Sequence, residues 1–420
     1  MQFVPFDPAD PKASLAQLPH LPAVFALYGA EAKDEPYIGC TPNLRGRLDR
    51  LLQPSPRHPR RLQLAGRVRR IDYHLTGSDF ESLLTQFEML EEFYGPKALE
   101  RMHLRAPAFV RFLGSNPYPR ITVTNKPSQR EADWSYGPFA SRASAERFAE
   151  EMLKLFLLRR CTDDLNPDPS HPGCVYSEMK MCLAPCYKGC SDDRYAEEAD
   201  AVQRFLATRG DSKLVILRSL RDKASADLAF EDAAALHAQV QKVEGVQSLA
   251  PELVQPMNKL RAVIVQASAN PDEVAVFMYM GGQLRGPVPF STIGMRIQNE
   301  QSGSSSLFAH PMALEPVPEG GDQKSEIGDL EQTATIKIPR TMLEARMEAV
   351  LEQLSASTTP PGSTVRLGHL ALLKRWYYRP EVKREGEVVF PDSESHWPLR
   401  ALLRAAGRVA AKKVAAPKPQ

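Results

Sequence analysis

The sequence lacks the apolar segments that membrane and secreted proteins carry. No run of about eighteen apolar residues occurs, and no apolar segment of the secretory type follows the start. These absences predict a cytoplasmic protein without a membrane span. The sequence also lacks a dominant charge, because 53 Lys and Arg face 51 Asp and Glu, for a net charge of +2. No overall electrostatic field therefore favours a nucleic acid as partner.

Cysteine is scarce, with 6 in 420 residues, yet all but Cys40 lie in the window CTDDLNPDPSHPGCVYSEMKMCLAPCYKGC. In a reducing cytoplasm such a cluster more often binds a metal than forms disulfides. The spacing C-x12-C-x7-C-x3-C is that of Cys161, Cys174, Cys182 and Cys186. Four thiolates can hold a tetrahedral zinc ion or an iron–sulfur cluster, and spacing does not separate the two. Cys190 is a fifth candidate ligand, and a set of buried free thiols is the alternative.

Arginine is concentrated in one segment of the chain. Between residues 41 and 70, nine arginines face a single acid, Asp49. Such a block can neutralise the phosphates of DNA, although a solvated basic loop is an equal alternative. The candidate DNA-binding residues are Arg45, Arg50, Arg60 and Arg61.

The hydrophobic pattern predicts a mixed α/β (α+β) multidomain protein. Strands are expected at 23–28, 35–39 and 70–77, and helices after Asn43 and after Ser78 or Asp79, with Gly95 as the stop. This order is a small β-β-α-β-α module. The predicted divisions are this module at 1–105, a cysteine-rich metal-binding region at 106–195, a helical hairpin at 196–250, a β-rich segment at 251–305, a flexible linker at 306–332 and a C-terminal α+β module with a disordered tail at 333–420.

The cysteine window and the residues before it resemble a known family. YGPFASRASAERFAEEMLKLFLLRRC, followed by GCVYSEMKMCLAPC, is similar to the cysteine-rich region of the UvrC subunit of the bacterial excinuclease. The family pattern is Y-F-G-P, a helix, L-F-x-L-R-x-C, and then two cysteine groups ending in C-L-A-P-C. The resemblance implies a four-iron, four-sulfur cluster on the four spaced cysteines, with zinc as the alternative occupant.

A second resemblance lies in the predicted hairpin. LAFEDAAALHAQVQKVEGV is similar to the UVR motif, and Phe230, Glu231 and Ala234 match its F-E-x-A-A core. In the family this hairpin docks against a similar hairpin of the helicase UvrB. The resemblance therefore implies a UvrB-type partner and covers roughly residues 20–290.

The first module resembles the GIY-YIG nuclease domain, with AVF, YIG and NLRGRL in the family order. Such a nuclease needs a base, a carboxylate that binds a divalent metal, and cations for the transition state. Tyr37 and Arg47 keep their family types, whereas Phe25 replaces the base tyrosine, Cys40 the lysine and Gln86 the metal-binding glutamate. The resemblance thus implies a weakened or inactive site, and Mg²⁺ is expected only if the site is active.

Glu88 does not simply replace Gln86, because two residues further along a helix rotate a side chain by about 200°. No stretch after residue 260 matches the family's RNase H-like domain, and no helix-hairpin-helix pair is found, so a shortened member is expected. Residues 375–384 mix aromatics with cations, which predicts either a single-stranded DNA surface or, more often, a strand-turn-strand surface.

The leading interpretation is a DNA repair protein of nucleotide excision repair that binds DNA and a UvrB-type helicase. Two alternatives remain. One is an active GIY-YIG endonuclease that makes a single incision with other acids, and the other is an interaction module that docks to the helicase without contacting DNA.

Overall fold

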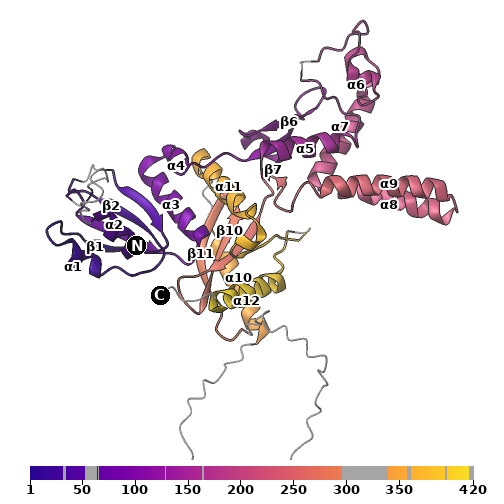
Figure 1. Cartoon of the computed structure of the whole chain (residues 1–420). Helices are drawn as coiled ribbons and strands as arrows, with labels where there is room; N and C mark the ends of the chain where they lie inside the picture. Colours follow the sequence, from indigo (N-terminus) through magenta and orange to yellow (C-terminus); the bar gives the residue numbers. More distant parts are fainter. Residues whose placement is uncertain are drawn as a thin grey trace, which may run out of the picture.

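A computed structural model describes residues 1–31, 35–52, 64, 66–127, 129–162, 165–295, 339–356, 361–392 and 395–415. Within these residues the chain forms three sheets of four strands, covered by helices. Figure 1 shows the sheets in separate parts of the molecule, with one helical pair standing away from them. This is the mixed α/β multidomain architecture that the sequence predicts.

The first sheet has the strand order β1-β4-β2-β3. Its elements are β1 (Gln2–Pro5), α1 (Pro11–Ala16), β2 (Ala23–Tyr28), β3 (Tyr37–Thr41), α2 (Leu44–Leu52), β4 (Arg70–Leu75), α3 (Asp79–Tyr94) and α4 (Lys97–Arg101). The predicted order β-β-α-β-α is confirmed from β2 to α3. Strand β1, which pairs antiparallel with β4, is absent from the prediction because its 4 residues are too few for a periodic pattern.

The predicted caps set the ends of the helices in this module. The side chain of Asn43 accepts a hydrogen bond from the Gly46 amide at 2.9 Å and begins α2. The Ser78 hydroxyl accepts one from the Glu81 amide at 3.1 Å and begins α3. Gly95 ends α3 with a φ of +52°, a conformation that favours glycine.

Helices cover the first sheet from two sides. On one face Phe25 and Leu27 of β2 form a core with α2. On the other face Val24 and Ala26 pack against Met89 of α3. Because successive strand residues point to opposite faces, every side chain of β2 is directed toward one of these two cores.

The second sheet has the strand order β6-β5-β7-β8. Its strands are β5 (Ala108–Phe112), β6 (Ile121–Thr124), β7 (Ser135–Phe139) and β8 (Gln255–Pro256), with the 3₁₀ helix Gln129–Trp134 before β7 and α5 (Arg142–Leu153) after it. The Gly-Pro pair at 137–138 favours a turn, yet residues 135–139 form a buried strand whose Tyr136 and Phe139 belong to the core with α5.

The third sheet, with strand order β11-β10-β9-β12, unites two segments that the sequence separates. Its elements are β9 (Ala262–Ala267), β10 (Glu273–Met280), β11 (Gln283–Ser291), α10 (Arg340–Ser355), α11 (Ser363–Tyr377), the 3₁₀ helix Glu381–Lys383, β12 (Glu387–Val389) and α12 (Leu399–Ala415). Strand β12 pairs with β9, so the predicted division between 251–305 and 333–420 does not separate two folding units. The predicted linker at 306–332 lies outside the described residues.

Two helices on each side bury the third sheet. Helices α10 and α12 form a core with one face, and α11 and α3 form a core with the other. Gly368 permits the close packing of α11 on α3, because a Cβ there would lie 2.0 Å from the Phe87 ring. Helix α3 therefore joins the first module to the third sheet.

Two expectations for the C-terminal module are wrong. The strand-turn-strand surface expected around residues 375–390 begins as the last turn of α11, and Trp376 is buried, with its ring N–H bonded to the Glu385 carbonyl at 2.9 Å. The part of the expected disordered tail up to Ala415 continues α12, and residues 416–420 lie outside the described residues. Among the described residues, no helix is long and apolar enough to cross a bilayer.

His369 of α11 makes the stability of this module depend on pH. Its side chain is 2% exposed, and its Nδ1 accepts a hydrogen bond from the Leu284 amide at 2.9 Å. Burial lowers the pKa of His369 to about 4, from an ordinary 6.5. The unfolded chain therefore binds a proton that the folded chain does not bind between these values, and stability falls as the pH falls.

We expect the native protein to lose about 2 kcal/mol more stability between pH 7 and pH 5 than a His369→Asn variant. Asparagine can accept the Leu284 hydrogen bond but does not titrate. Urea unfolding of both proteins at the two pH values measures the difference. Equal losses in the two proteins would contradict the assignment.

Candidate functional site

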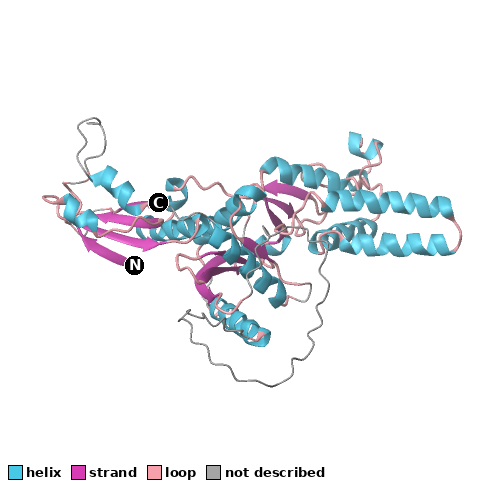
Figure 2. Ribbon diagram, turned by 60° about the horizontal axis from the view of Figure 1, so that its bottom comes forward, coloured by secondary structure: helices cyan, strands magenta, loops and turns pink. Residues whose placement is uncertain are grey.

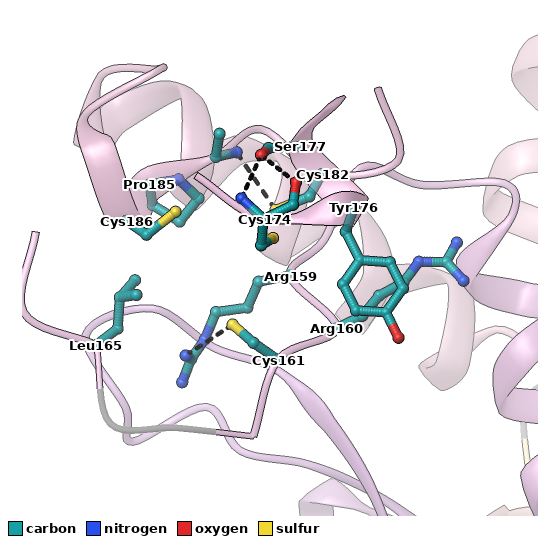
Figure 3. Close-up of a pocket in the computed structure, with 11 residues that line it drawn as sticks. Arg159, Arg160, Cys161, Leu165, Cys174, Tyr176, Ser177, Cys182, Pro185 and Cys186 are labelled. Atoms are coloured by element: carbon teal, nitrogen blue, oxygen red, sulfur yellow. Dashed lines mark hydrogen bonds between the residues drawn. The ribbon is translucent and has the colours of Figure 1, made fainter. Parts of the chain in front are cut away.

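Four cysteines, those with the predicted spacing, line one pocket: Cys161, Cys174, Cys182 and Cys186. Figure 3 shows Cys161 and Arg159 reaching the pocket from one side and the other three cysteines from the opposite side. Short helical segments hold the other three cysteines in place. Cys174 caps α6 (Val175–Glu178), Cys182 follows that helix, and Cys186 lies in the 3₁₀ helix Pro185–Tyr187.

Local hydrogen bonds explain why a loop rich in Pro and Gly holds this shape. The Cys174 amide donates to the Ser177 hydroxyl at 2.9 Å, and that hydroxyl donates to the Cys174 carbonyl at 2.6 Å. Gly173 has a φ of +82°, which a residue with a side chain rarely adopts. The Ala184 amide donates to the Cys182 sulfur at 3.3 Å.

The four thiols influence one another electrostatically. Burial, and after it the neighbouring Cys161, Cys186 and Cys174, raise the pKa of Cys182 to about 11. Burial also raises the pKa of Cys186, again with Cys174 and Cys161 contributing. These thiols therefore favour the protonated form until a cation binds them as thiolates and releases the protons.

Cys190 stands apart from the four. It packs at the edge of the core formed with the second sheet, and the charged groups that act on it are Arg194 and Asp192. It does not line the pocket. The structure thus separates this fifth candidate from the four spaced cysteines.

The sulfur atoms in the pocket are suitable ligands for a zinc ion or an iron–sulfur cluster. The pocket offers four sulfur atoms, and N–H groups of Ala184 and Arg159 point at two of them, as is common around iron–sulfur and zinc thiolates. Among the residues that the structure describes, no group of three or more His, Cys, Asp or Glu side chains has closed into a metal-binding arrangement. The four sulfurs therefore share a pocket without forming a ligand shell, and the donor set does not distinguish zinc from iron–sulfur.

The residues predicted to form the nuclease site lie on both faces of the first sheet. Phe25 is 1% exposed, and its ring centroid lies 6.2 Å from that of Tyr37 on the α2 face. Arg47 lies half-buried on α2. Cys40 pairs with Val24 and so belongs to the α3 face.

Gln86 lies on α3, three residues before Met89, and thus on the side of that helix that meets the sheet. The structure therefore brings Phe25 and Tyr37 together but places Gln86 and Cys40 across the sheet from them. Water reaches the Glu88 side chain, yet the protein atoms around it desolvate the carboxyl and raise its pKa to about 7. Because the side chain is exposed, solvent screening limits this effect.

Of the arginines of α2, Arg45 and Arg47 are half-buried and Arg50 is exposed. The Arg50 guanidinium donates to the Gly46 carbonyl at 2.9 Å, and that of Arg45 reaches the Ala16 carbonyl at 3.5 Å. Neither arginine, nor Arg47, forms an ion pair with another residue in the described part of the chain. Arg60 and Arg61 lie outside the described residues.

The predicted hairpin is formed by α8 (Asp211–Ala226) and α9 (Phe230–Gln247), preceded by α7 (Asp192–Ala207). Figures 1 and 2 show the two helices side by side, projecting away from the sheets. Near the base, Leu214 and Val243 join the core of the second sheet. At the tip Phe230 is 66% exposed, and Glu231 and Ala234 are exposed as well.

Comparison with known proteins shows similarity to one family over part of the chain. The family model described as UvrC/Cho excinuclease, middle domain, matches residues 109–205, which contain the four-cysteine pocket. The chain is 29% identical over 227 residues to UvrABC system protein C of Aliivibrio fischeri and 28% identical over 211 residues to that of Alcanivorax borkumensis. It is 27% identical over 306 residues to UvrABC system protein C of Ruminiclostridium cellulolyticum.

Residues 109–205 are a UvrC-type middle domain. The three matches to UvrABC system protein C cover 53%, 50% and 71% of this chain, and 36%, 34% and 49% of the relatives. The chain therefore spans about a third to a half of the length of the curated relatives it matches. No solved structure matches it significantly.

Sequence reasoning missed one residue of the pocket that bears on its chemistry. Arg159 lines the pocket beside Cys161 and is fully buried, which no pattern of charge or periodicity predicts. The available signal was its place in LFLLRRC, where it matches the arginine of the UvrC-family pattern L-F-x-L-R-x-C.

Proposed function

We propose that this chain acts in nucleotide excision repair, binding DNA and a UvrB-type helicase, with its GIY-YIG module serving as a binding platform whose nuclease site is weakened or inactive. The observation that carries the proposal is Phe25. Its ring is buried against Tyr37 and has no hydroxyl, so the position of the general base cannot move a proton.

Two further replacements should also weaken the nuclease site. Gln86 is a neutral amide and a poor ligand for Mg²⁺, and Cys40 replaces a cation. Tyr37 and Arg47 keep the polar groups that could contact a phosphate. The experiment that tests the proposal is incision of a lesion-bearing duplex, with DNA binding measured on the same protein.

A second candidate function has one observation in its favour. Glu88, an acid on α3 with a raised pKa, could supply a carboxyl group that Gln86 does not. A single-incision endonuclease with a rebuilt site is the function that this residue would support. Glu88→Gln would then abolish the incision.

The helical hairpin supports the partnership with a helicase. Its base is fixed by the core and by the ion pair of Arg218 with Glu244, 2.8 Å apart across the two helices. Its tip exposes Leu228 and Phe230, which a partner can cover. If the chain were instead an interaction module that never contacts DNA, its function would depend on this hairpin alone.

The pocket of four cysteines supports a metal centre, either a four-iron, four-sulfur cluster or zinc. When bound, such a centre supplies a rigid cross-link between the segments that carry the thiolates, and an iron–sulfur cluster could also carry an electron. The chain's own contribution is to gather Cys161, Cys174, Cys182 and Cys186 and to aim N–H donors at the sulfurs of Cys182 and Cys161.

We expect Cys186→Ser to abolish metal binding by the full-length protein purified without oxygen. The native chain should retain metal, measured by elemental analysis, with a broad visible absorption band if the metal is iron. Cys190→Ser is the matched control, because Cys190 lies in the same window but outside the pocket. Loss of metal in the Cys190 variant, with retention in the Cys186 variant, would contradict this ligand assignment.

A further inference from the structure

Arg159 is a buried cation beside the four-cysteine pocket. Its side chain is 1% exposed, and it is among the largest fully buried side chains of the described chain. Burying a guanidinium is costly unless hydrogen bonds and opposite charge compensate it. The question is what this cation serves in that place.

A backbone carbonyl holds the Arg159 side chain, and a tyrosine hydroxyl holds its backbone. The Arg159 Nε donates to the Tyr118 carbonyl at 3.0 Å. The Arg159 amide donates at 3.1 Å to the hydroxyl of Tyr195 on α7, which itself donates to the Pro119 carbonyl at 2.8 Å. The guanidinium is thereby tied to the Tyr118 carbonyl, and the backbone at Arg159 is tied to α7.

One end of this guanidinium points at sulfur. Its Nη1 lies 3.5 Å from the Cys161 sulfur, and Figure 3 shows it on the pocket side of the chain. The adjacent Arg160 also lines the pocket but is bonded elsewhere, with Nη2 donating to the Leu153 carbonyl at 2.8 Å and the guanidinium 6.0 Å from the Tyr176 ring centroid. Only the first of the two adjacent arginines is directed at a candidate ligand.

We propose that Arg159 is a positioning residue of the metal centre, holding Cys161 as a thiolate ligand and compensating the negative charge of the loaded site. The inference rests on the proposed four-thiolate centre. Four thiolates around Zn²⁺ or around an oxidised four-iron, four-sulfur core leave a net negative charge. A fixed cation with an N–H aimed at one sulfur stabilises that charge more than it stabilises four neutral thiols.

The proposal predicts a stability effect that depends on the metal. Arg159→Gln should lower the melting temperature of the metal-loaded chain more than that of the metal-free chain. It should also speed transfer of the metal to a chelator, corresponding to an affinity about 10 to 100 times weaker. Arg159→Lys keeps the charge and should be intermediate. Arg160→Gln is the matched comparison and should weaken metal binding much less than Arg159→Gln does, because the Arg160 guanidinium is not bonded to a sulfur.

A second measurement applies if the metal is iron. Reduction adds a negative charge to the site, so removing a nearby cation should shift the midpoint potential of the cluster to a more negative value. Arg159→Gln should show this shift, and Arg160→Gln, whose guanidinium is bonded to the Leu153 carbonyl and not to a sulfur, should show a smaller one. A residue with only a structural role would not move the potential of a cluster that remains bound.

The outcomes separate this inference from the metal centre itself. If the native chain binds metal and Cys186→Ser does not, the centre stands. The role of Arg159 is then overturned if Arg159→Gln holds the metal as tightly as Arg160→Gln does. It is also overturned if Arg159→Gln destabilises the metal-free and metal-loaded chains equally, because that result assigns Arg159 to folding alone. A native chain that binds neither iron nor zinc would overturn the proposed centre as well.

Discussion

A lesion-bearing duplex incubated with this chain, Mg²⁺ or Mn²⁺, and UvrA- and UvrB-type partners is expected to remain uncut by the GIY-YIG module. General acid–base assistance alone is worth about two to four orders of magnitude in rate, and Phe25 cannot provide it. Loss of the metal-binding carboxylate at Gln86 adds to this deficit. Incision should therefore fall below the level that gel analysis of an end-labelled duplex detects.

The control is a Tyr37→Phe, Arg47→Ala double variant. Any cleavage that this variant shows at the native level belongs to a contaminating nuclease. Binding to the same duplex, followed by fluorescence anisotropy at increasing salt, should be retained by the native chain and weaken steeply with salt. Cleavage by the native chain that disappears in the double variant would refute the inactive site, and Glu88→Gln would then test a rebuilt one.

The sequence predicts the first module well because its signals are local. Asn43, Ser78 and Gly95 act within one turn of the helices they begin or end, so the pattern contains the information. Strand β7 is different. Its Gly-Pro pair is typical of a turn, and the segment is a strand only because β5 and β8 pair with it from distant parts of the chain.

The third sheet shows the same limit over a longer range. Strand β12 has 3 residues and pairs with β9, more than a hundred positions earlier in the sequence. The aromatic residues at the end of α11 look like a nucleic-acid surface in the sequence, whereas tertiary packing buries Trp376 in the core between α11, α3 and the sheet. Composition does not reveal which side of a helix its neighbours cover.

The candidate site divides in a similar way. Spacing and order identify Cys161, Cys174, Cys182 and Cys186, because sulfur ligands are rare enough to stand out in the sequence. Spacing cannot exclude Cys190, whose distance from the pocket depends on the fold of the loop. Nor can it show that Phe25 and Gln86 lie on opposite faces of one sheet, because that depends on the strand register and on which face α3 covers.

Docking of a UvrB-type helicase is expected to depend on Phe230. This side chain stands at the tip of the hairpin, 66% exposed, where no core of the described chain includes it. An aromatic side chain that becomes buried in an interface typically contributes about 2 kcal/mol or more, so Phe230→Ala should weaken binding by about thirtyfold or more. Because the side chain is exposed in the free chain, the same change should leave its melting temperature nearly unaltered.

Val215→Ala provides the matched control for this experiment. Val215 is also 66% exposed, but it lies in the first turns of α8, toward the base of the hairpin. Isothermal titration calorimetry of the isolated helicase against each variant should show a large loss for Phe230→Ala and a small one for Val215→Ala. Equal affinities for both variants would place the docking surface elsewhere, because an apolar tip that contributes no binding energy is not the part of the hairpin that the partner covers.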